Sequence, residues 1–419
     1  MLLPLLMACL SSEAPPPSET PSEQAENPLA QATSPNVVVI LIDTLREDAL
    51  LRAETPHIDA LRTSGSSSQH AWSAGTWTVP SIMSLFTGKS VREHGWDEPS
   101  ARIGHYPVMG DHLTLAERLR SEGFETTGYY ANPYLSEELG MERGFQTWKR
   151  SGDAQIPKLF EQLVREQWAS SAAPQFAYLH LIGPHSPLNP SPEARLRWQV
   201  EDSWFEERRG LMIGAAKRNR RPGVREAYRK AYHAVIEDTD RRVGEIVEAL
   251  RSVEGPTWIL LTSDHGELLG EHNVVGHGSH LYQALTHIPF IVTPPEGQAP
   301  LVLPENLNNA ALPSLVCQIA ELQCSFPTPV DPSLPLVSQR EGMLALSPDG
   351  TQKGIWGPSP ARFDLSTDPN ETHPLPITAS LDRAREAWLS ETPPGGVSPE
   401  AISIDGENAE RLRALGYQE

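Results

Sequence analysis

The run VVVILI at residues 37–42 is the feature that most constrains the fold, because it places six apolar, mostly β-branched residues in a row. A strand with one face in water alternates apolar and polar residues, whereas an uninterrupted apolar strand is buried on both faces. Such strands are typical of parallel sheets that are covered by helices. The run stops at Asp43, where a more polar segment begins.

Strand and helix patterns alternate along the rest of the chain. Helices are expected at 56–64, 80–88, 112–123 and 225–252, and strands at 124–132, 176–182, 258–267 (which runs into a polar turn) and 287–292. This order predicts a doubly wound α/β fold with a mixed, mostly parallel sheet flanked by helices. Sites in such sheets lie at the carboxyl ends of the strands. Reactive groups stand at three of these ends: Asp43, His180 with His185, and Asp264 with His265.

The charge balance and the apolar pattern exclude several classes of protein. The chain carries 34 Lys and Arg against 54 Asp and Glu, a net charge of −20, which argues against a nucleic-acid partner because little would neutralise phosphates. No apolar run reaches the roughly 18 residues of a membrane-spanning helix. Three cysteines are too few for a disulfide scaffold.

The first 35 residues are expected to lie outside the globular fold. The run LMAC at 6–9 resembles a bacterial lipobox, so residues 1–9 are predicted as a lipoprotein-type signal segment with Cys9 as the lipidation site. An ordinary N-terminus without a lipid is the alternative. Residues 10–35 are rich in Pro, Ser and Glu and predict a disordered tether. Together they predict an exported bacterial lipoprotein of the cell envelope, periplasmic or outer-surface, whose only contact with the membrane is its lipid anchor.

Asp264 and His265 stand side by side at a strand end and are followed by Gly266, which allows the backbone to reverse. Mixed carboxylate and imidazole ligation suits a hard or borderline divalent metal ion. Asp43 at the neighbouring strand end would add a second carboxylate, although an acid in that position often only caps the next helix. The three strand ends therefore indicate a metal site.

Several segments resemble the sulfatase branch of the alkaline phosphatase superfamily, in the order of that family. They are NVVVILIDTLREDAL, TPHIDALRTSG, the nucleophile segment TWTVPSIMSLFTGKSVREHG, the metal segment LTSDHGELLGEHNVVGHGSHLYQALTHIPFIV, and the short C-terminal motifs FDLSTDPNE (363–371) and ERLRALGY (410–417). The resemblance implies an alkaline-phosphatase-like αβα sandwich, a bound metal ion and ester cleavage. It also implies a catalytic domain over 36–300, with 301–419 completing the fold and adding a small C-terminal subdomain.

The nucleophile segment departs from the family pattern. Sulfatases carry a Cys or Ser that becomes formylglycine, followed by an Arg, but Thr78 and Ile82 occupy these two positions. The resemblance then implies that the Thr78 hydroxyl itself is the nucleophile, activated by the metal. The alternative is that Thr78 only caps a helix that opens at Pro80.

The expected metal set is also reduced, because Thr44 stands where the family commonly has a second acid. The ligands that remain are Asp43, Thr78, Asp264 and His265, enough for one divalent ion: Ca²⁺, Mn²⁺ or Mg²⁺, with Zn²⁺ as the alternative. A second ion would need another Asp, and the resemblance supplies none.

The resemblance also assigns roles to the histidines. His185 and His277 are expected to act in catalysis, since an imidazole can donate a proton to the leaving oxygen. His180 and His280 are expected to bind substrate, as is Asn132, which lies where the family has basic residues.

These features predict a metal-dependent sulfatase-family hydrolase or transferase that cleaves a phosphate or sulfate ester through Thr78. A phosphate ester suits a Thr nucleophile better than a sulfate ester does. The alternative is a non-catalytic lipoprotein of the same family that binds an anion without turnover. The substrate and the oligomeric state do not follow from the sequence.

Two further features remain open. Cys317 and Cys324 would lie roughly 10 Å apart on a continuous helix over 308–322, too far to bridge, but a helix that ends earlier would let a turn join them. Residues 208–230 hold nine Lys or Arg and one Glu. They predict either a solvated insertion or a basic collar that attracts an anionic ester.

Overall fold

The computed structural model describes residues 34–97, 106–107, 109–201 and 222–395, and a few positions near the C-terminus (401–402, 406 and 409–410). The predicted signal segment with Cys9, the tether up to residue 33, residues 208–221 of the basic segment and nearly all of ERLRALGY lie outside these ranges. In the part of the chain that is described, every helix is too short or too polar to span a bilayer.

Seven strands form the main sheet, in the order β2-β11-β8-β1-β7-β5-β6. Their bounds are β1 Asn36–Ile42, β2 Ser66–Ser67, β5 Glu125–Tyr130, β6 Thr147–Arg150, β7 Gln175–Leu181, β8 Thr257–Thr262 and β11 Phe290–Thr293. Strands β1, β5, β6, β7 and β8 pair in parallel, whereas β11 and β2 pair antiparallel at one edge. The predicted mixed, mostly parallel sheet is therefore confirmed.

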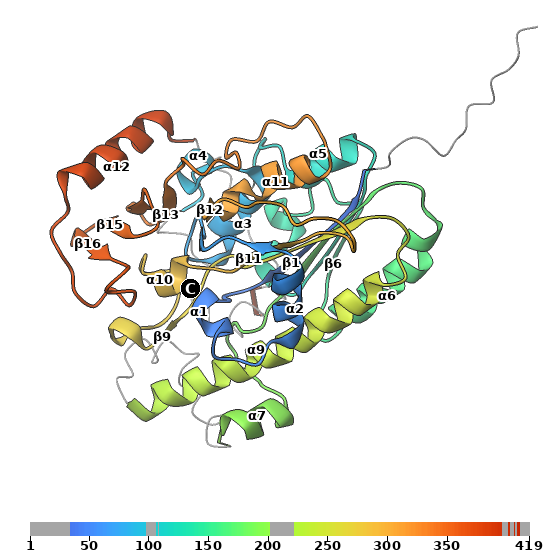
Figure 1. The fold of residues 1–419 in the computed structure, drawn as a ribbon, viewed down its shortest axis with the longest axis horizontal. Helices are drawn as coiled ribbons and strands as arrows, with labels where there is room; N and C mark the ends of the chain where they lie inside the picture. The colour runs from blue at the N-terminus through green and yellow to red at the C-terminus, as the bar shows by residue number, and fades with distance from the viewer. Residues whose placement is uncertain are drawn as a thin grey trace, which may run out of the picture. The chain divides into compact units, whose positions relative to one another are not determined.

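Strand β1 lies at the centre of the sheet, and all seven of its residues are buried. Val37 and Leu41 belong to the core on one face, and Ile40 and Ile42 to the core on the other. The helices α2 (Pro56–Ser64), α6 (Ile156–Glu166), α7 (Pro192–Trp198) and α9 (Pro222–Leu250) cover one face, while α3 (Thr78–Thr87), α5 (Leu115–Ser121) and α11 (Leu312–Ile319) cover the other (Figure 1). This double cover explains why the strand has no polar alternation.

Short elements connect these layers. They are α1 (Glu47–Leu50), β3 (His70–Trp72), α4 (Val91–His94), β4 (Tyr106–Pro107), β9 (Leu268–Leu269), β10 (Val275–Gly276), α10 (Gln283–Thr286), β12 (Asn306–Asn308) and β17 (Ala401–Ile402). Most predicted boundaries are shifted by one to three residues. Among them, α3 begins at Thr78 rather than at Pro80.

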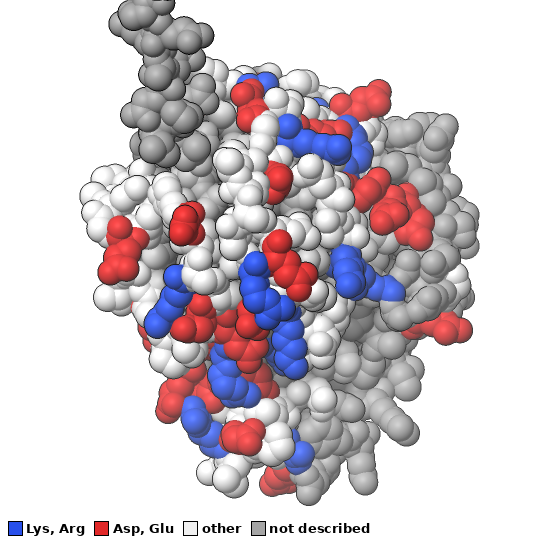
Figure 2. Space-filling model, turned by 90° about the vertical axis from the view of Figure 1, so that its right-hand side faces the viewer, with Lys and Arg blue, Asp and Glu red and all other residues white. Residues whose placement is uncertain are grey.

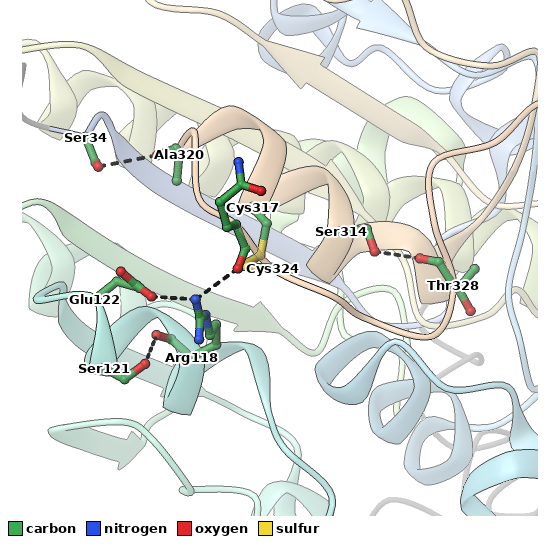
Figure 3. The surroundings of a disulfide bond; sticks show 10 residues. Ser34, Arg118, Ser121, Glu122, Ser314, Cys317, Ala320, Cys324 and Thr328 are labelled. Carbon is green, nitrogen blue, oxygen red and sulfur yellow. Dashed lines mark hydrogen bonds and ion pairs between the residues drawn. A yellow bond between two sulfur atoms is a disulfide. The ribbon is translucent and has the colours of Figure 1, made fainter.

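The helix predicted over 308–322 is shorter than expected, and this settles the question of the two cysteines. Helix α11 ends at Ile319, and the following turn places the Cα atoms of Cys317 and Cys324 5.9 Å apart in a disulfide (Figure 3). Arg118 of α5 donates to the carbonyl oxygen of Gln323 at 3.0 Å and so holds this turn against the next helix. The chain reversal, rather than a continuous helix, makes the bridge possible.

Figure 2 shows one face of the molecule, on which Lys and Arg side chains lie among Asp and Glu side chains in small groups. Exposed ion pairs, such as that between Arg165 and Glu166 at 3.3 Å, contribute about 0.2–1 kcal/mol each. The two apolar cores on either side of the sheet are therefore the main source of stability.

The predicted C-terminal subdomain is a four-stranded antiparallel sheet with one helix. Its elements are β13 (Leu336–Arg340), β14 (Met343–Ser347), β15 (Gln352–Trp356), β16 (Ala361–Asp364) and α12 (Ala379–Glu391). Leu381 of α12 packs with Leu346 and Trp356 in a small core of its own. The subdomain thus has its own apolar centre.

A buried ion pair within the subdomain lies against residues of the rest of the fold. The Lys353 ammonium of β15 lies 2.9 Å from Glu371 Oε1 and 4.7 Å from the centre of the Trp72 ring. It also donates to Thr286 Oγ1 at 3.3 Å. Both charged side chains are almost fully buried, so each depends on the other for its charge.

We expect Glu371→Ala to lower the free energy of unfolding by about 3–5 kcal/mol, because it leaves the Lys353 ammonium buried and unpaired. Urea denaturation followed by circular dichroism measures this loss. Replacing both partners, as in Lys353→Met with Glu371→Leu, should cost far less, since the apolar pair leaves no charge behind. Equal losses in the single and double variants would contradict the role given to the pair.

Candidate active site and metal centre

The carboxyl ends of four neighbouring strands bring polar side chains together at one edge of the sheet. Leu41 of β1 pairs with His180 of β7 on one side and with Thr262 of β8 on the other, so these strands end level with one another. Thr78 enters from the first turn of α3. Six predicted site residues are fully buried there: Asp43, Thr78, Asn132, His180, Asp264 and His265.

The Asp43 carboxylate is held from one side only. Its Oδ2 accepts a hydrogen bond from Asn132 Nδ2 at 2.7 Å and lies 3.2 Å from His180 Nε2. Tyr178 lies 2.9 Å from the other ring nitrogen of His180 and fixes the orientation of that ring. Asp43 Oδ1 is buried and has no hydrogen-bond partner. The neighbours therefore orient the carboxylate and leave one oxygen for another ligand.

Asp264 and His265 are held in the same way. Asp264 Oδ1 accepts the backbone N–H groups of Thr44 at 3.1 Å and of His265 at 2.9 Å, while Oδ2 has no partner. His265 Nδ1 donates to the carbonyl oxygen of Gly266 at 2.9 Å, which leaves Nε2 as an unprotonated lone pair without a partner.

The three buried unpartnered atoms, Asp43 Oδ1, Asp264 Oδ2 and His265 Nε2, lie within 4.8 Å of one another. His265 Nε2 is 3.4 Å from Asp264 Oδ2 and 4.0 Å from Asp43 Oδ1. Buried polar atoms are rarely left unpaired, and three acceptors that face one another call for a cation. Two carboxylate oxygens and one imidazole suit a divalent ion such as Mn²⁺, Mg²⁺ or Zn²⁺. The residues present thus fit a metal ion.

The electrostatics of the site favour the same interpretation. Burial, and then the charge of Asp43, raise the pKa of Asp264 to about 6. Burial would also raise the pKa of Asp43, but His185 and the hydrogen bond from His180 outweigh it and hold that pKa well below its usual value. Burial lowers the pKa of His265 and favours the neutral imidazole that a metal requires. A cation between the two carboxylates would relieve their repulsion.

Thr78 is placed beside this cluster by α3. Its Oγ1 accepts a hydrogen bond from Asn132 Nδ2 at 3.3 Å, so one amide group joins Thr78 to Asp43. The helix begins at Thr78 itself, Trp77 is the N-cap residue, and no side chain caps the helix. The alternative role of Thr78 as a helix cap is therefore wrong. Its hydroxyl is linked through the Asn132 amide to the Asp43 carboxylate.

The sequence model of the family described as Sulfatase matches residues 35–316.

The chain belongs to the sulfatase family.

An arylsulfatase from Clostridium perfringens is 22% identical over 331 residues, which cover 62% of this chain and 69% of that protein. The phosphonate monoester hydrolase of Agrobacterium radiobacter has a similar structure, with a TM-score of 0.65 and 17% identity over 85% of this chain and 94% of that one. A protein solved with its substrate D-glucosamine-2-N,6-O-disulfate gives a TM-score of 0.66 and 14% identity, over 85% and 96%. The resemblance inferred from the sequence is thus confirmed, and the protein is a sulfatase-like ester hydrolase.

The structure brings two of the three remaining predicted histidines to the cluster of this sulfatase-family protein. The ring of His277 lies 4.5 Å from that of His265 and 5.1 Å from that of His185, measured between centroids. His280 lies beside Ser279 and stacks on Tyr282, with ring centroids 5.4 Å apart. His185 and His277 are therefore next to the metal cluster, whereas the contacts seen for His280 are with its own loop.

Asn132 and His180, predicted to bind substrate, both bond to the Asp43 carboxylate. In this position they orient a candidate metal ligand. Contact of either with a substrate stays a prediction.

Two residues that the sequence analysis missed tie α3, which carries Thr78, to the segment that carries Asp264 and His265. Ser81 Oγ donates to the backbone oxygen of Asp264 at 2.5 Å, and Asn309 Nδ2 donates to Ser81 Oγ at 3.0 Å. Asn309 also accepts the N–H of Ala74 at 3.0 Å. Asn309 is 228 residues from Ser81 in the chain, so no local pattern could have indicated it.

A third missed residue, Arg340, reaches the site from β13 of the subdomain. It donates to the backbone oxygen of Gly278 at 2.7 Å, pairs with Asp97 at 2.8 Å, and lies 5.5 Å from the centre of the Trp77 ring. Gly278 follows His277 and Trp77 precedes Thr78. One guanidinium group thus fixes the neighbours of two predicted catalytic residues.

We expect Arg340→Lys to lower kcat by about tenfold or more while leaving KM nearly unchanged. Lys lacks the rigid planar fork of donors with which Arg340 contacts Gly278, Asp97 and the Trp77 ring together, and small displacements of reacting groups cost large factors in rate. Steady-state kinetics and the melting temperature should be measured together. Arg251→Lys, at an exposed pair with Glu248, is the matched control and should behave as the wild type. A fall in stability with an unchanged kcat would contradict the positioning role.

Proposed function

We propose that this protein is a metal-dependent hydrolase that cleaves a sulfate or phosphate ester with Thr78 as its nucleophile. The observation that carries the proposal is the set of three unpartnered ligand atoms on Asp43, Asp264 and His265, joined to the Thr78 hydroxyl through Asn132. Thr cannot be converted to formylglycine by the route that sulfatases use for Cys or Ser.

Asp43, Asp264 and His265 would hold the ion, which would lower the pKa of a bound hydroxyl and stabilise negative charge on the ester. Thr78 Oγ1 supplies the attacking oxygen. The N-terminus of α3 favours an anion at the same point. His277 and His185, which lie beside His265, would give a proton to the leaving oxygen.

A phosphate or phosphonate ester is favoured over a sulfate ester because an unmodified hydroxyl attacks phosphorus in the related phosphodiesterases. The structural similarity to a phosphonate monoester hydrolase agrees with this choice. Sulfate esters remain a second possible substrate class, because a protein that acts on a disulfated glucosamine also has a similar structure.

The test is a panel of 4-nitrophenyl sulfate, a phosphate monoester, a phosphate diester and a phosphonate monoester, assayed with the purified protein. Each is measured after chelation and again with Ca²⁺, Mg²⁺, Mn²⁺ or Zn²⁺. We expect turnover of at least one phosphorus ester that depends on the added metal. Binding of phosphate or sulfate without turnover of any ester would instead support the non-catalytic, anion-binding alternative.

We also propose that the protein is exported and anchored through Cys9. The support is the lipobox-like sequence and the Cys317–Cys324 disulfide, which persists in oxidising compartments. Cys9→Ser should move the protein from the membrane fraction to the soluble fraction of cells. A wild-type protein that is already soluble would contradict the anchor.

A further inference from the structure

Glu267 is a buried carboxylate that the site described so far does not use. It lies between His265 and β9, and only 2% of its surface is exposed. Its Oε2 lies 2.8 Å from His277 Nδ1, and its Oε1 accepts the Tyr228 hydroxyl of α9 at 3.3 Å. Its backbone oxygen accepts Arg46 Nη1 at 2.9 Å. Side chain and backbone are therefore fixed by three separate segments.

The contact with His277 determines how that imidazole can act. A carboxylate accepts hydrogen bonds only, so the Nδ1 that faces Glu267 must carry the proton. A hydrogen bond of this kind fixes both the tautomer and the rotation of the ring, and assigns proton exchange to Nε2. The same ring lies 4.5 Å from the ring of His265. The carboxylate thus acts on a histidine that already borders the metal cluster.

A buried carboxylate is a poor choice for stability alone. Removing a charge from water is costly, and an apolar side chain of similar size is often no less stable in such a place. Leu268 and Leu269, the next two residues, are buried and apolar. The acid between them and the metal ligand is therefore better explained by what it does to His277.

We propose that Glu267 is a positioning residue, which holds His277 so that Nε2 donates a proton to the leaving oxygen of the ester. This inference rests on the proposed function. Thr78 Oγ1 first releases its proton to solvent. As the bond from this oxygen to sulfur or phosphorus forms, the bond from the sulfur or phosphorus atom to the leaving oxygen breaks, and its electron pair passes to the leaving oxygen. The oxygen takes the proton from Nε2, and His277 becomes a neutral imidazole protonated at Nδ1. Glu267 remains a carboxylate throughout and balances the charge of the imidazolium before the transfer.

The test uses a series of aryl and alkyl esters whose leaving groups become steadily less acidic. A good leaving group needs no proton, whereas a poor one does. We expect Glu267→Gln to lower kcat/KM by about threefold or less for a 4-nitrophenyl ester and by about 100-fold for the poorest leaving group. The double variant with His277→Ala should be no slower than His277→Ala alone, because the two residues act as one unit. A uniform loss across the series, or additive losses, would overturn the proposal.

Glu271→Gln is the matched control, since Glu271 belongs to the same loop but bonds to Arg46 Nη1 at 2.9 Å instead of a histidine. Any loss that it causes should be the same for every leaving group. A steeper dependence in Glu271→Gln than in Glu267→Gln would overturn the assignment.

A second measurement does not depend on turnover. Long-range ¹H–¹⁵N NMR of the full protein should show His277 protonated at Nδ1, and Glu267→Ala should lose this preference. A wild-type His277 protonated at Nε2 would overturn the proposal. An enzyme inactive on every ester would refute the proposed function, and the NMR result would still decide whether Glu267 positions His277.

Discussion

Thr78→Ala is expected to abolish turnover, with a fall in kcat of at least about 10³-fold, and to leave the fold intact. The change removes the proposed nucleophile, and loss of a nucleophile leaves only the small contribution of binding and electrostatics. The cost in stability should be about 1 kcal/mol, because the hydroxyl makes a single 3.3 Å hydrogen bond from Asn132 and caps nothing. Kinetics and thermal unfolding of the same preparation measure both quantities.

Thr87→Ala is the matched control for this variant. Thr87 is also a buried Thr of α3, but it lies at the far end and bonds to the backbone oxygen of Met83 at 2.6 Å. It should lose some stability and keep its kcat. Mass spectrometry of the wild type should show an unmodified Thr at position 78. Full activity of Thr78→Ala, or an aldehyde at position 78, would contradict the mechanism.

Asp264→Ala is expected to lose the metal ion and activity together, with kcat again falling by about 10³-fold or more. One carboxylate and one imidazole remain, too few to hold a divalent ion firmly. Metal content per chain and kcat should be measured on the same samples. The wild type should also melt at a higher temperature when metal is added, since a ligand at 100 times its Kd stabilises by about 2.7 kcal/mol. The variant should show no such shift.

Without metal, a variant that lacks the Asp264 charge should be no less stable than the wild type. Asp43 and Asp264 repel each other in the absence of a cation, and this repulsion contributes to the pKa of about 6 at Asp264. Asp264→Asn relieves it and should be at least as stable as the metal-free wild type. Asp238→Asn is the control: Asp238 is buried on α9 and bonds to Ser191 at 2.7 Å, so its loss should lower stability and leave metal binding unchanged. Activity that survives exhaustive chelation would contradict the metal requirement.

The sequence alone predicted the parts of the fold that follow from the pattern of apolar and polar residues. The run at 37–42 predicted a strand buried on both faces, and the two cores on either side of β1 confirm it. Asp43, Asp264 and His265 could be placed together because parallel strands end at one edge of a sheet. The residue types then indicated the metal before any contact was known.

What the sequence could not indicate depends on contacts between distant segments. Asn309 and Arg340 act on the site through single hydrogen bonds to backbone groups, and such bonds leave no pattern in composition or periodicity. The hydrogen bonds of Asn132 to Asp43 and Thr78 could not be predicted for the same reason. The predicted start of α3 is two residues late, because Pro is accepted anywhere in the first turn of a helix and Pro80 is the third residue of α3.

The attachment of the β13–β16 sheet determines when, during its synthesis, this enzyme becomes active. Arg340 and the Lys353–Glu371 pair lie late in the chain, yet Arg340 bonds to Gly278, next to His277, and Lys353 bonds to Thr286, both of them earlier in the chain. A ribosome that has completed only the first three hundred residues has therefore made every proposed catalytic group without these contacts. Incomplete or proteolysed chains should be inactive, and activity should appear in one late step, when the final hairpins pack against the rest of the fold. Shortening the protein at the apparent end of its catalytic domain would give an inert fragment.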